Sequence, residues 1–145
     1  MKNIAIKELV CNHIYTKFGD SSERFLDPKL LETLDVIRNK ILNIPLVINN
    51  RTTITQRGLR CNCCNIVVGK TKKNIPYLSG HCLGKAVDFS SGSMSANDMR
   101  KKIIENKDLL PYKIRMESEK DAPTWVHIDI MVSKDQEDKI YVFRA

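Results

Sequence analysis

Apolar residues in the first part of the chain recur every three or four positions, which is the spacing of an amphipathic helix. The pattern predicts a helix over residues 4–18 that ends at Gly19. A second helix should begin after Asp27, which can cap it, with Pro28 in the first turn, and a third should begin near Ser95. The predicted buried faces are Ile4, Ile6, Leu9, Val10, His13, Ile14 and Phe18, then Leu30, Leu31, Leu34, Ile37 and Ile41, then Met99, Ile103 and Ile104.

From Pro45 onward the pattern changes to short runs rich in β-branched residues, which is typical of strands. Polar connectors separate the last three runs and favour antiparallel pairing. Helices first and strands later indicate an α+β domain, with helices packed on one face of a mostly antiparallel sheet. No repeat or linker divides the chain, so we expect a single domain over residues 1–145. The predicted strands are 46–48, 86–89, 112–117, 125–132 and 140–143.

A long connection without a regular pattern lies between residues 49 and 84. Connections of this length are uncommon inside a compact domain, and those that occur usually serve a function. We therefore expect the functional site to be built partly from this segment.

Two candidate metal ligands flank a glycine at the end of this connection. His81 follows a Ser-Gly turn, and Asp88 lies seven residues later at the end of an apolar run. Gly84 lets the chain bend between them, so both side chains can reach one point. A carboxylate in such a run is costly to bury unless it is paired or bound to a metal.

A third candidate ligand, His127, lies in an alternating segment. Alternation places Trp125, His127, Asp129 and Met131 on one face of the predicted strand, opposite an apolar set that belongs in the core. Two histidines and one carboxylate can hold zinc and leave a fourth position for water, which is the ligand set of a hydrolytic site. The alternative for each histidine is an ordinary hydrogen-bonded residue of a turn or a sheet.

Two segments resemble the signatures of a known family. Ser79-Gly80-His81-x-x-Gly84-x-Ala86-x-Asp88 is similar to the SxHxxGxAxD signature of the zinc D-Ala-D-Ala peptidases, and Trp125-Val126-His127 is similar to their WxH signature. That family includes D-alanyl-D-alanine carboxypeptidases, dipeptidases and many phage endolysins, and it shares its metal site with the hedgehog signalling domain. The resemblance covers the chain from about residue 25 to the C-terminus. It implies a hedgehog/D-Ala-D-Ala peptidase-like fold, with Zn²⁺ held by His81, Asp88 and His127.

The catalytic glutamate departs from the common pattern of that family. Many members carry it three residues before the last ligand, where this chain has Thr124. Another branch carries it at the end of the preceding strand, and Glu117 matches that place. We expect Glu117 to act as the general base, with Glu119 and Asp121 as alternatives. Antiparallel pairing of the predicted strands would place Glu117 near Trp125.

Substrate-binding residues are expected upstream of His81, where the family carries an arginine that grips the substrate. A guanidinium can hold a carboxylate with two parallel hydrogen bonds, and it can also polarise the scissile carbonyl. Arg57 is the first choice for both roles, and Arg60 is the second. Ser79 and Trp125 complete the expected substrate-binding set, although Ser79 can equally be a plain turn serine.

Five cysteines, at positions 11, 61, 63, 64 and 82, make an odd number, which favours reduced thiols in a chain without an export signal. Cys61, Cys63 and Cys64 could form half of a zinc knuckle. No second Cys or His pair stands at a matching distance in the sequence. We therefore expect these cysteines to be small buried hydrophobic residues rather than metal ligands.

The formal net charge of +7 suits an acidic partner such as nucleic acid, anionic lipid or the cell wall, although the basic residues are spread along the whole chain. Helix-turn-helix and aromatic-rich signatures are absent, so we expect no nucleic-acid partner. Lysines at positions 2, 7 and 17 interrupt any apolar leader, and no apolar run is long enough to span a membrane. We expect a monomer made in the cytoplasm without a signal peptide, either released to the cell wall with the help of a holin, as in a phage lysin, or acting in the cytoplasm on imported or recycled peptides.

The sequence therefore predicts a zinc metallopeptidase of the carboxypeptidase or endopeptidase type, with peptidoglycan peptides as its partners. Its substrates would be amide bonds next to D-alanine in stem peptides or cross-links. The alternative is a catalytically inactive zinc-containing binding module with a hedgehog-like metal site.

Overall fold

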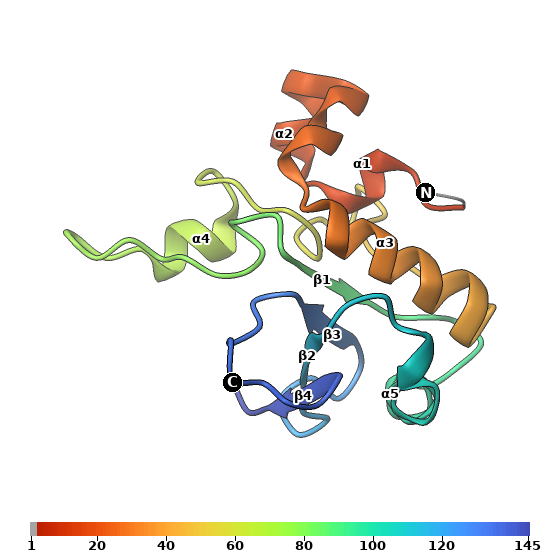
Figure 1. Cartoon of the computed structure of the whole chain (residues 1–145). Coiled ribbons are helices and arrows are strands. Elements are labelled where there is room, and N and C mark those ends of the chain that lie inside the picture. The colour runs from red at the N-terminus through yellow and green to blue at the C-terminus, as the bar shows by residue number, and fades with distance from the viewer. Residues whose placement is uncertain (1–2) are drawn as a thin grey trace.

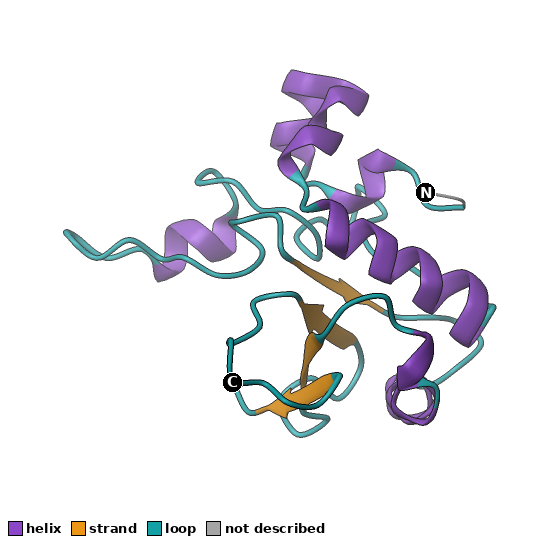
Figure 2. Cartoon of the chain, in the orientation of Figure 1, coloured by secondary structure: helices purple, strands orange, loops and turns teal. Residues whose placement is uncertain are grey.

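A computed structural model describes residues 3–145 of the chain. The fold is α+β, as the sequence predicts, and five α-helices in this range accompany a four-stranded mixed sheet (Figure 1, Figure 2). The single domain expected over residues 1–145 stays a prediction. Met1 and Lys2 lie outside the described residues. Lys2 is one of the three lysines expected to interrupt an apolar leader.

The predicted first helix is interrupted by two extended residues. Val10 forms a parallel bridge with Leu59, and the N–H of Cys11 donates to the carbonyl of Leu59 at 2.9 Å. Because this pairing holds the backbone extended, the helical hydrogen bonds cannot continue, and the single helix predicted over residues 4–18 is wrong. Gly19 still ends the helical segment, with φ of 56°. The two short helices are α1 (Ile6–Leu9) and α2 (Asn12–Phe18).

The next long helices begin where the sequence predicts. The Asp27 carboxylate accepts a hydrogen bond from the N–H of Lys29, and the Ser95 hydroxyl accepts one from the N–H of Asp98. These caps satisfy N–H groups that have no partner inside the helix. The helical elements after α2 are η1 (Gly19–Phe25), α3 (Pro28–Val36), η2 (Ile37–Leu42), α4 (Asn65–Lys70), α5 (Ala96–Glu105) and η3 (Lys107–Leu109).

The sheet has the strand order β1-β3-β2-β4, with β3 between β1 and β2. Both neighbours of β3 are antiparallel to it, whereas β4 pairs with β2 in parallel. The antiparallel pairing predicted for the last three strands is therefore wrong for β4, which crosses past β2 and runs in the same direction. The strands are β1 (Ala86–Phe89), β2 (Ile114–Glu117), β3 (Val126–Asp129) and β4 (Ile140–Phe143).

The strand predicted over residues 46–48 is reduced to one bridge, between Val47 and Ser90. The hydrogen bonds of Val47 and Ser90 hold this segment beside the end of β1 without extending the sheet by a regular strand. Leu46 and Ile48 are buried all the same, as a strand on the core would require.

One face of the sheet packs into the main hydrophobic core and the other carries polar groups. The core includes Met116 of β2 and Val126 and Ile128 of β3, together with apolar residues of α3, η2 and α5. Because side chains alternate along a strand, the residues between these core positions point to the opposite face. That face carries Arg115, Glu117, His127 and Asp129.

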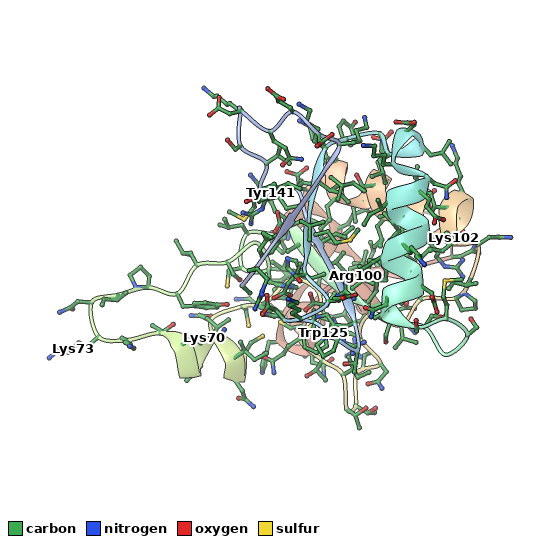
Figure 3. All side chains as sticks on the ribbon, turned by 90° about the horizontal axis from the view of Figure 1, so that it is seen from below. Lys70, Lys73, Arg100, Lys102, Trp125 and Tyr141 are labelled. Carbon is green, nitrogen blue, oxygen red and sulfur yellow. The ribbon has the colours of Figure 1, made fainter. Side chains whose placement is uncertain are left out.

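The long connection contains an arm, residues 61–79, that extends away from the sheet and the larger helices (Figure 1). It carries α4, which ends at Lys70, and Lys73 lies farther out, near the tip of the arm (Figure 3). The arm exposes Val68, Ile75 and Leu78. Every helix within residues 3–145 is too short or too polar to span a bilayer.

Candidate functional site

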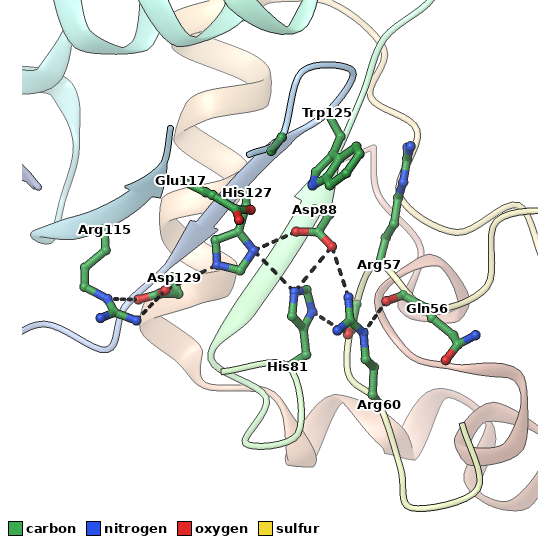
Figure 4. Close-up of polar contacts among 12 residues, drawn as sticks. Gln56, Arg57, Arg60, His81, Asp88, Arg115, Glu117, Trp125, His127 and Asp129 are labelled. Carbon is green, nitrogen blue, oxygen red and sulfur yellow. Dashed lines mark hydrogen bonds and ion pairs between the residues drawn. The ribbon is translucent and has the colours of Figure 1, made fainter. Parts of the chain in front are cut away.

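Three side chains from separate parts of the chain converge on the polar face of the sheet (Figure 4). Asp88 of β1 lies directly across from His127 of β3 in the antiparallel register. Asp88 Oδ1 is 2.7 Å from His127 Nδ1, and Asp88 Oδ2 is 3.3 Å from His81 Nε2. The two imidazole nitrogens are 3.3 Å apart. The structure thus brings together the three residues expected to be metal ligands.

His81 reaches the sheet because the chain turns sharply after it. Gly84 has φ of +68°, and an added Cβ would lie 2.1 Å from the carbonyl oxygen of Phe25. A residue with a side chain would be strained in this conformation and would clash with that backbone, so glycine is required. The turn returns the chain to β1, where Asp88 follows within the buried strand.

The ring of His81 is oriented by a backbone carbonyl. Its Nδ1 lies 2.9 Å from the carbonyl oxygen of Gly58, so Nδ1 carries the proton and donates it. Nε2 is then the nitrogen that faces Asp88 and His127. The segment from Arg57 to Arg60 also bonds to the backbone of two site residues. The N–H of Asp88 donates to the carbonyl of Arg57, and the N–H of Arg60 donates to the carbonyl of His81.

The ring of His127 is oriented by a second carboxylate. Its Nε2 lies 3.3 Å from Asp129 Oδ2, which leaves Nδ1 directed at Asp88. Arg115 holds Asp129 in turn through two hydrogen bonds, of 2.8 and 2.9 Å. Histidines that bind metals commonly donate their other N–H to a carboxylate or a carbonyl, which fixes the ring. Asp129 was not predicted as a site residue, although the alternation of the strand placed it on the face of His127.

The charges of the cluster depend on these contacts. Burial opposes the charged form of His127, but its hydrogen bonds to Asp129 and Asp88 outweigh that effect and raise its pKa to about 9. Burial likewise opposes the charge of Asp88, yet the hydrogen bonds from His127 and His81 lower its pKa well below the usual range. The site therefore favours an ionised carboxylate beside positive charge, and a cation can take the place of the proton.

A metal ion fits this group. His81 Nε2, a carboxylate oxygen of Asp88 and His127 Nδ1 all lie within 4.8 Å of one another. His81 and Asp88 are buried, and His127 is largely buried. One carboxylate together with two imidazoles whose outer nitrogens are already hydrogen-bonded is a common arrangement for a divalent metal.

The two arginines expected to bind substrate lie in different places. Arg60 donates from Nη2 to Asp88 Oδ2 at 3.2 Å and from Nε to the carbonyl of Gln56, and it lines the cleft beside the cluster. Arg57 instead donates to the hydroxyl of Ser90 at 2.7 Å and does not line this cleft. The side chain of Arg60, the second choice, is therefore the one that faces the cluster.

Glu117 lies on the same face of the sheet as His127. The register pairs Arg115 with Asp129 and Met116 with Ile128, so its continuation sets Glu117 across from His127. This differs from the position near Trp125 that was expected, because the strands are offset by two residues from the predicted pairing. For that reason Glu117 lies closer to the three candidate metal ligands than the predicted pairing implied (Figure 4).

The two alternatives to Glu117 point elsewhere. Asp121 accepts two hydrogen bonds from Arg144 and one from the N–H of Ala145 at the C-terminus. Glu119 lines a separate cavity beside Arg100 of α5. Neither of them lines the cleft that contains His81 and His127.

The cleft beside the cluster has a volume of about 460 Å³ and also contains Glu117, Ser79 and Trp125. Ser79 donates to the sulfur of Cys82 at 3.7 Å, as a residue of the turn. Residues of the arm, including Tyr77 and Leu78, form part of its wall. A cleft of this size can take a segment of a peptide or another small molecule.

Comparisons of the chain with models of protein families, with curated proteins and with solved structures found no match. The chemistry of the cleft therefore has to be argued from the residues themselves.

Proposed function

We propose that this chain is a zinc peptidase that hydrolyses amide bonds next to D-alanine in peptidoglycan stem peptides or cross-links. His81, Asp88 and His127 would hold the zinc. The observation that carries the proposal is the convergence of these three side chains at a cleft that also contains Glu117, with both imidazole rings fixed by hydrogen bonds at their other nitrogens.

The spacing of the ligand atoms suits zinc. Zinc–nitrogen and zinc–oxygen bonds of about 2.0–2.2 Å in a tetrahedron separate neighbouring ligand atoms by about 3.3–3.5 Å. The observed distances from His81 Nε2 to Asp88 and to His127 are both 3.3 Å. The 2.7 Å contact between His127 and Asp88 is shorter, as expected of a direct hydrogen bond that a cation would replace.

Zinc bound to two imidazoles and a carboxylate supplies a Lewis acid and lowers the pKa of a coordinated water to about 7. Glu117 would accept the proton of the attacking water and pass it to the leaving amine. Its place across from His127 supports this role.

Arg60 is the better candidate for polarising the scissile carbonyl or gripping a substrate carboxylate. Its guanidinium has five donors, and the two bonds to Asp88 and Gln56 use only part of them. Arg57 would then support the site through its backbone, since its carbonyl accepts from the N–H of Asp88 at 2.7 Å.

The substrate class rests on the two sequence signatures and on the basic side chains that the cleft offers beside the carboxylates of Asp88, Glu117 and Asp129. Arg60, Lys70 and Arg115 line the cleft beside apolar walls that include Trp125 and Leu78. Such a surface favours a short peptide with a free carboxylate and small apolar side chains, as at the end of a stem peptide. The resemblance to the zinc D-Ala-D-Ala peptidases also supports a hedgehog-like arrangement of the fold around the metal.

The test is hydrolysis of defined peptides by the zinc-loaded chain. A synthetic stem peptide ending in D-Ala-D-Ala and a purified cross-linked muropeptide are incubated with the chain, and the products are identified by mass spectrometry. We expect release of D-alanine or cleavage of the cross-link, which chelator abolishes and added zinc restores. The matched control is the stem peptide ending in L-Ala-L-Ala. If the zinc-loaded chain is inert toward both substrates, the peptidase proposal is wrong, and the result favours the alternative of a zinc-containing binding module.

A further inference from the structure

A second group of metal-binding side chains lies away from the cleft, where α2 meets the base of the arm. Cys11 and His13 come from the N-terminal segment, and Cys61 and Cys64 come from the start of the arm. We propose that these four residues form a structural zinc site. The proposal goes beyond the peptidase activity and does not depend on it.

All four ligand atoms lie within 4.8 Å of one another, and four of the six distances among them are close to those of a zinc tetrahedron. With zinc–sulfur bonds of about 2.3 Å and zinc–nitrogen bonds of about 2.0 Å, tetrahedral ligands lie about 3.8 Å apart for two sulfurs and about 3.5 Å for sulfur and nitrogen. Cys61 Sγ lies 3.6 Å from Cys11 Sγ, 3.9 Å from Cys64 Sγ and 3.6 Å from His13 Nδ1. Cys64 Sγ lies 3.9 Å from His13 Nδ1.

The residue types select zinc and a closed site. Three thiolates and one imidazole are a common ligand set for structural zinc, with two cysteines in the C-x₂-C spacing that Cys61 and Cys64 have here. Four protein ligands fill the tetrahedron, so a metal held here has no open position for a substrate. This group therefore differs in chemistry from the three-ligand group in the cleft.

Backbone pairing holds the two halves of this group together. Leu59 donates to the carbonyl of Leu9 at 2.8 Å, and Cys11 donates to the carbonyl of Leu59 at 2.9 Å. Gly58 permits this close approach, since a Cβ there would lie 2.1 Å from the oxygen of Leu9. The ligands are thus brought together by the fold on both sides of the group.

The surroundings of the group suit a metal that stabilises a segment with little core of its own. Cys11 and Cys64 are buried and pack with Val67 in a small cluster apart from the main core. The arm beyond them exposes much of its apolar surface. Because so small a cluster buries little apolar area, a metal bound to both halves would supply the stability that packing does not.

The sequence-based interpretation of these cysteines as small buried hydrophobic residues accounts for Cys64 alone. Cys61 is half-buried and Cys63 is exposed. The second pair of ligands, Cys11 and His13, was missing from the pattern because it precedes the first pair by a long stretch of chain.

The first test counts metal in the full chain, purified in reducing buffer and dialysed against trace zinc. Mass spectrometry of the metal content should find at least one zinc ion per chain. Cys61→Ser and Cys64→Ser should each contain one zinc ion fewer than the parent, whereas the matched controls Cys63→Ser and Cys82→Ser should contain as many as the parent. Equal zinc loss in Cys63→Ser and Cys61→Ser would overturn the proposal, as would a zinc content equal to the parent's in both ligand variants.

The second test needs no variant and separates this group from the one in the cleft. Cobalt bound to cysteine gives a sulfur-to-cobalt charge-transfer absorption in the near ultraviolet, and the three ligands in the cleft contain no sulfur. The parent chain loaded with cobalt should show this absorption together with the visible bands of a tetrahedral ion. Absence of the charge-transfer absorption would overturn the proposal.

Discussion

Asp129 lies two residues beyond His127 on the same strand, and its carboxylate faces the Nε2 atom of that histidine at 3.3 Å. The carboxylate is almost wholly buried and accepts two hydrogen bonds from Arg115. His127 is therefore fixed so that Nδ1 is the nitrogen that faces Asp88.

This relationship predicts the effect of Asp129→Asn. The amide keeps the shape of the side chain but removes the charge that orients and polarises His127, so zinc affinity in the cleft should fall about 10- to 100-fold. Titration against a competing chelator measures it. Asp121→Asn is the matched control, because Asp121 also pairs with an arginine but at the surface, and its affinity should equal that of the parent. Equal affinities of Asp129→Asn and the parent would contradict the role assigned to Asp129.

The metal ligands themselves can be tested by His81→Ala and His127→Ala. Each variant removes one of three ligands, so zinc should no longer be retained in the cleft after dialysis. Stability should also decrease, since binding energy contributes to the folded state. Metal analysis and thermal unfolding, with and without added zinc, measure both effects. A variant that keeps the parent's full zinc content would show that its histidine is not a ligand.

Glu117→Gln separates proton transfer from metal binding. The variant should keep zinc and fold while losing the acid–base contribution, about 10² to 10⁴ in the rate of hydrolysis. Glu119→Gln and Asp121→Asn are the controls and should have nearly normal rates, because these residues do not line the cleft. The rates of stem-peptide cleavage by these variants at saturating zinc are the measurement. Normal activity of Glu117→Gln with loss in either control would move the base into the loop after β2.

The raised pKa of His127 predicts how the chain behaves after its metal is removed. Its charged form is stabilised in the folded state, so this contribution to stability is fully present below pH 6.5 and is lost as the pH rises through about 9. Zinc must displace that proton, so zinc binding should strengthen between pH 6 and pH 9. A nuclear magnetic resonance titration of His127 in the chelated chain should give a midpoint near 9. Urea unfolding at pH 6.5 and 9 should show the lower stability at pH 9. A titration midpoint of His127 below pH 6.5 would contradict the prediction.

Gly58→Ala tests the contact that holds the N-terminal segment against the 57–60 segment. The new methyl group would meet the carbonyl of Leu9 at 2.1 Å, so the backbones must separate, at a cost of about 1–3 kcal/mol in the free energy of unfolding or more. Denaturant unfolding measures the change. Gly92→Ala is the matched control, since its methyl group would meet nothing within 4 Å. Equal stabilities of the two variants would mean that the close approach is not required.

Local signals predicted much of the fold. The caps at Asp27 and Ser95 depend on neighbouring residues alone, and both are confirmed. The strand predicted at residues 86–89 has the observed bounds of β1. The three candidate ligands in the cleft could also be named in advance, since each lies in a short segment whose pattern suits a functional side chain.

The features that were missed depend on distant contacts. The break after α1 exists because Val10 pairs with Leu59, and no residue near Val10 indicates it. The place of β4 beside β2, and its parallel direction, also depend on how strands distant in the sequence pair. The placement of Cys11 beside Cys61 follows from the same pairing as the helix break, so a pattern that considers one segment at a time could not reveal it.

The central position of β3 also decides when the cleft can exist during synthesis of the chain. Asp88 arrives on one neighbouring strand and Glu117 on the other, and His127 lies 39 residues after Asp88. A ribosome releases residues in order, so neither earlier strand finds its partner until β3 has emerged. Non-local strand pairing is also slow compared with helix formation. Chains that end before β3 therefore lack His127, the third side chain of the cluster, so the cleft cannot assemble until most of the chain has been made.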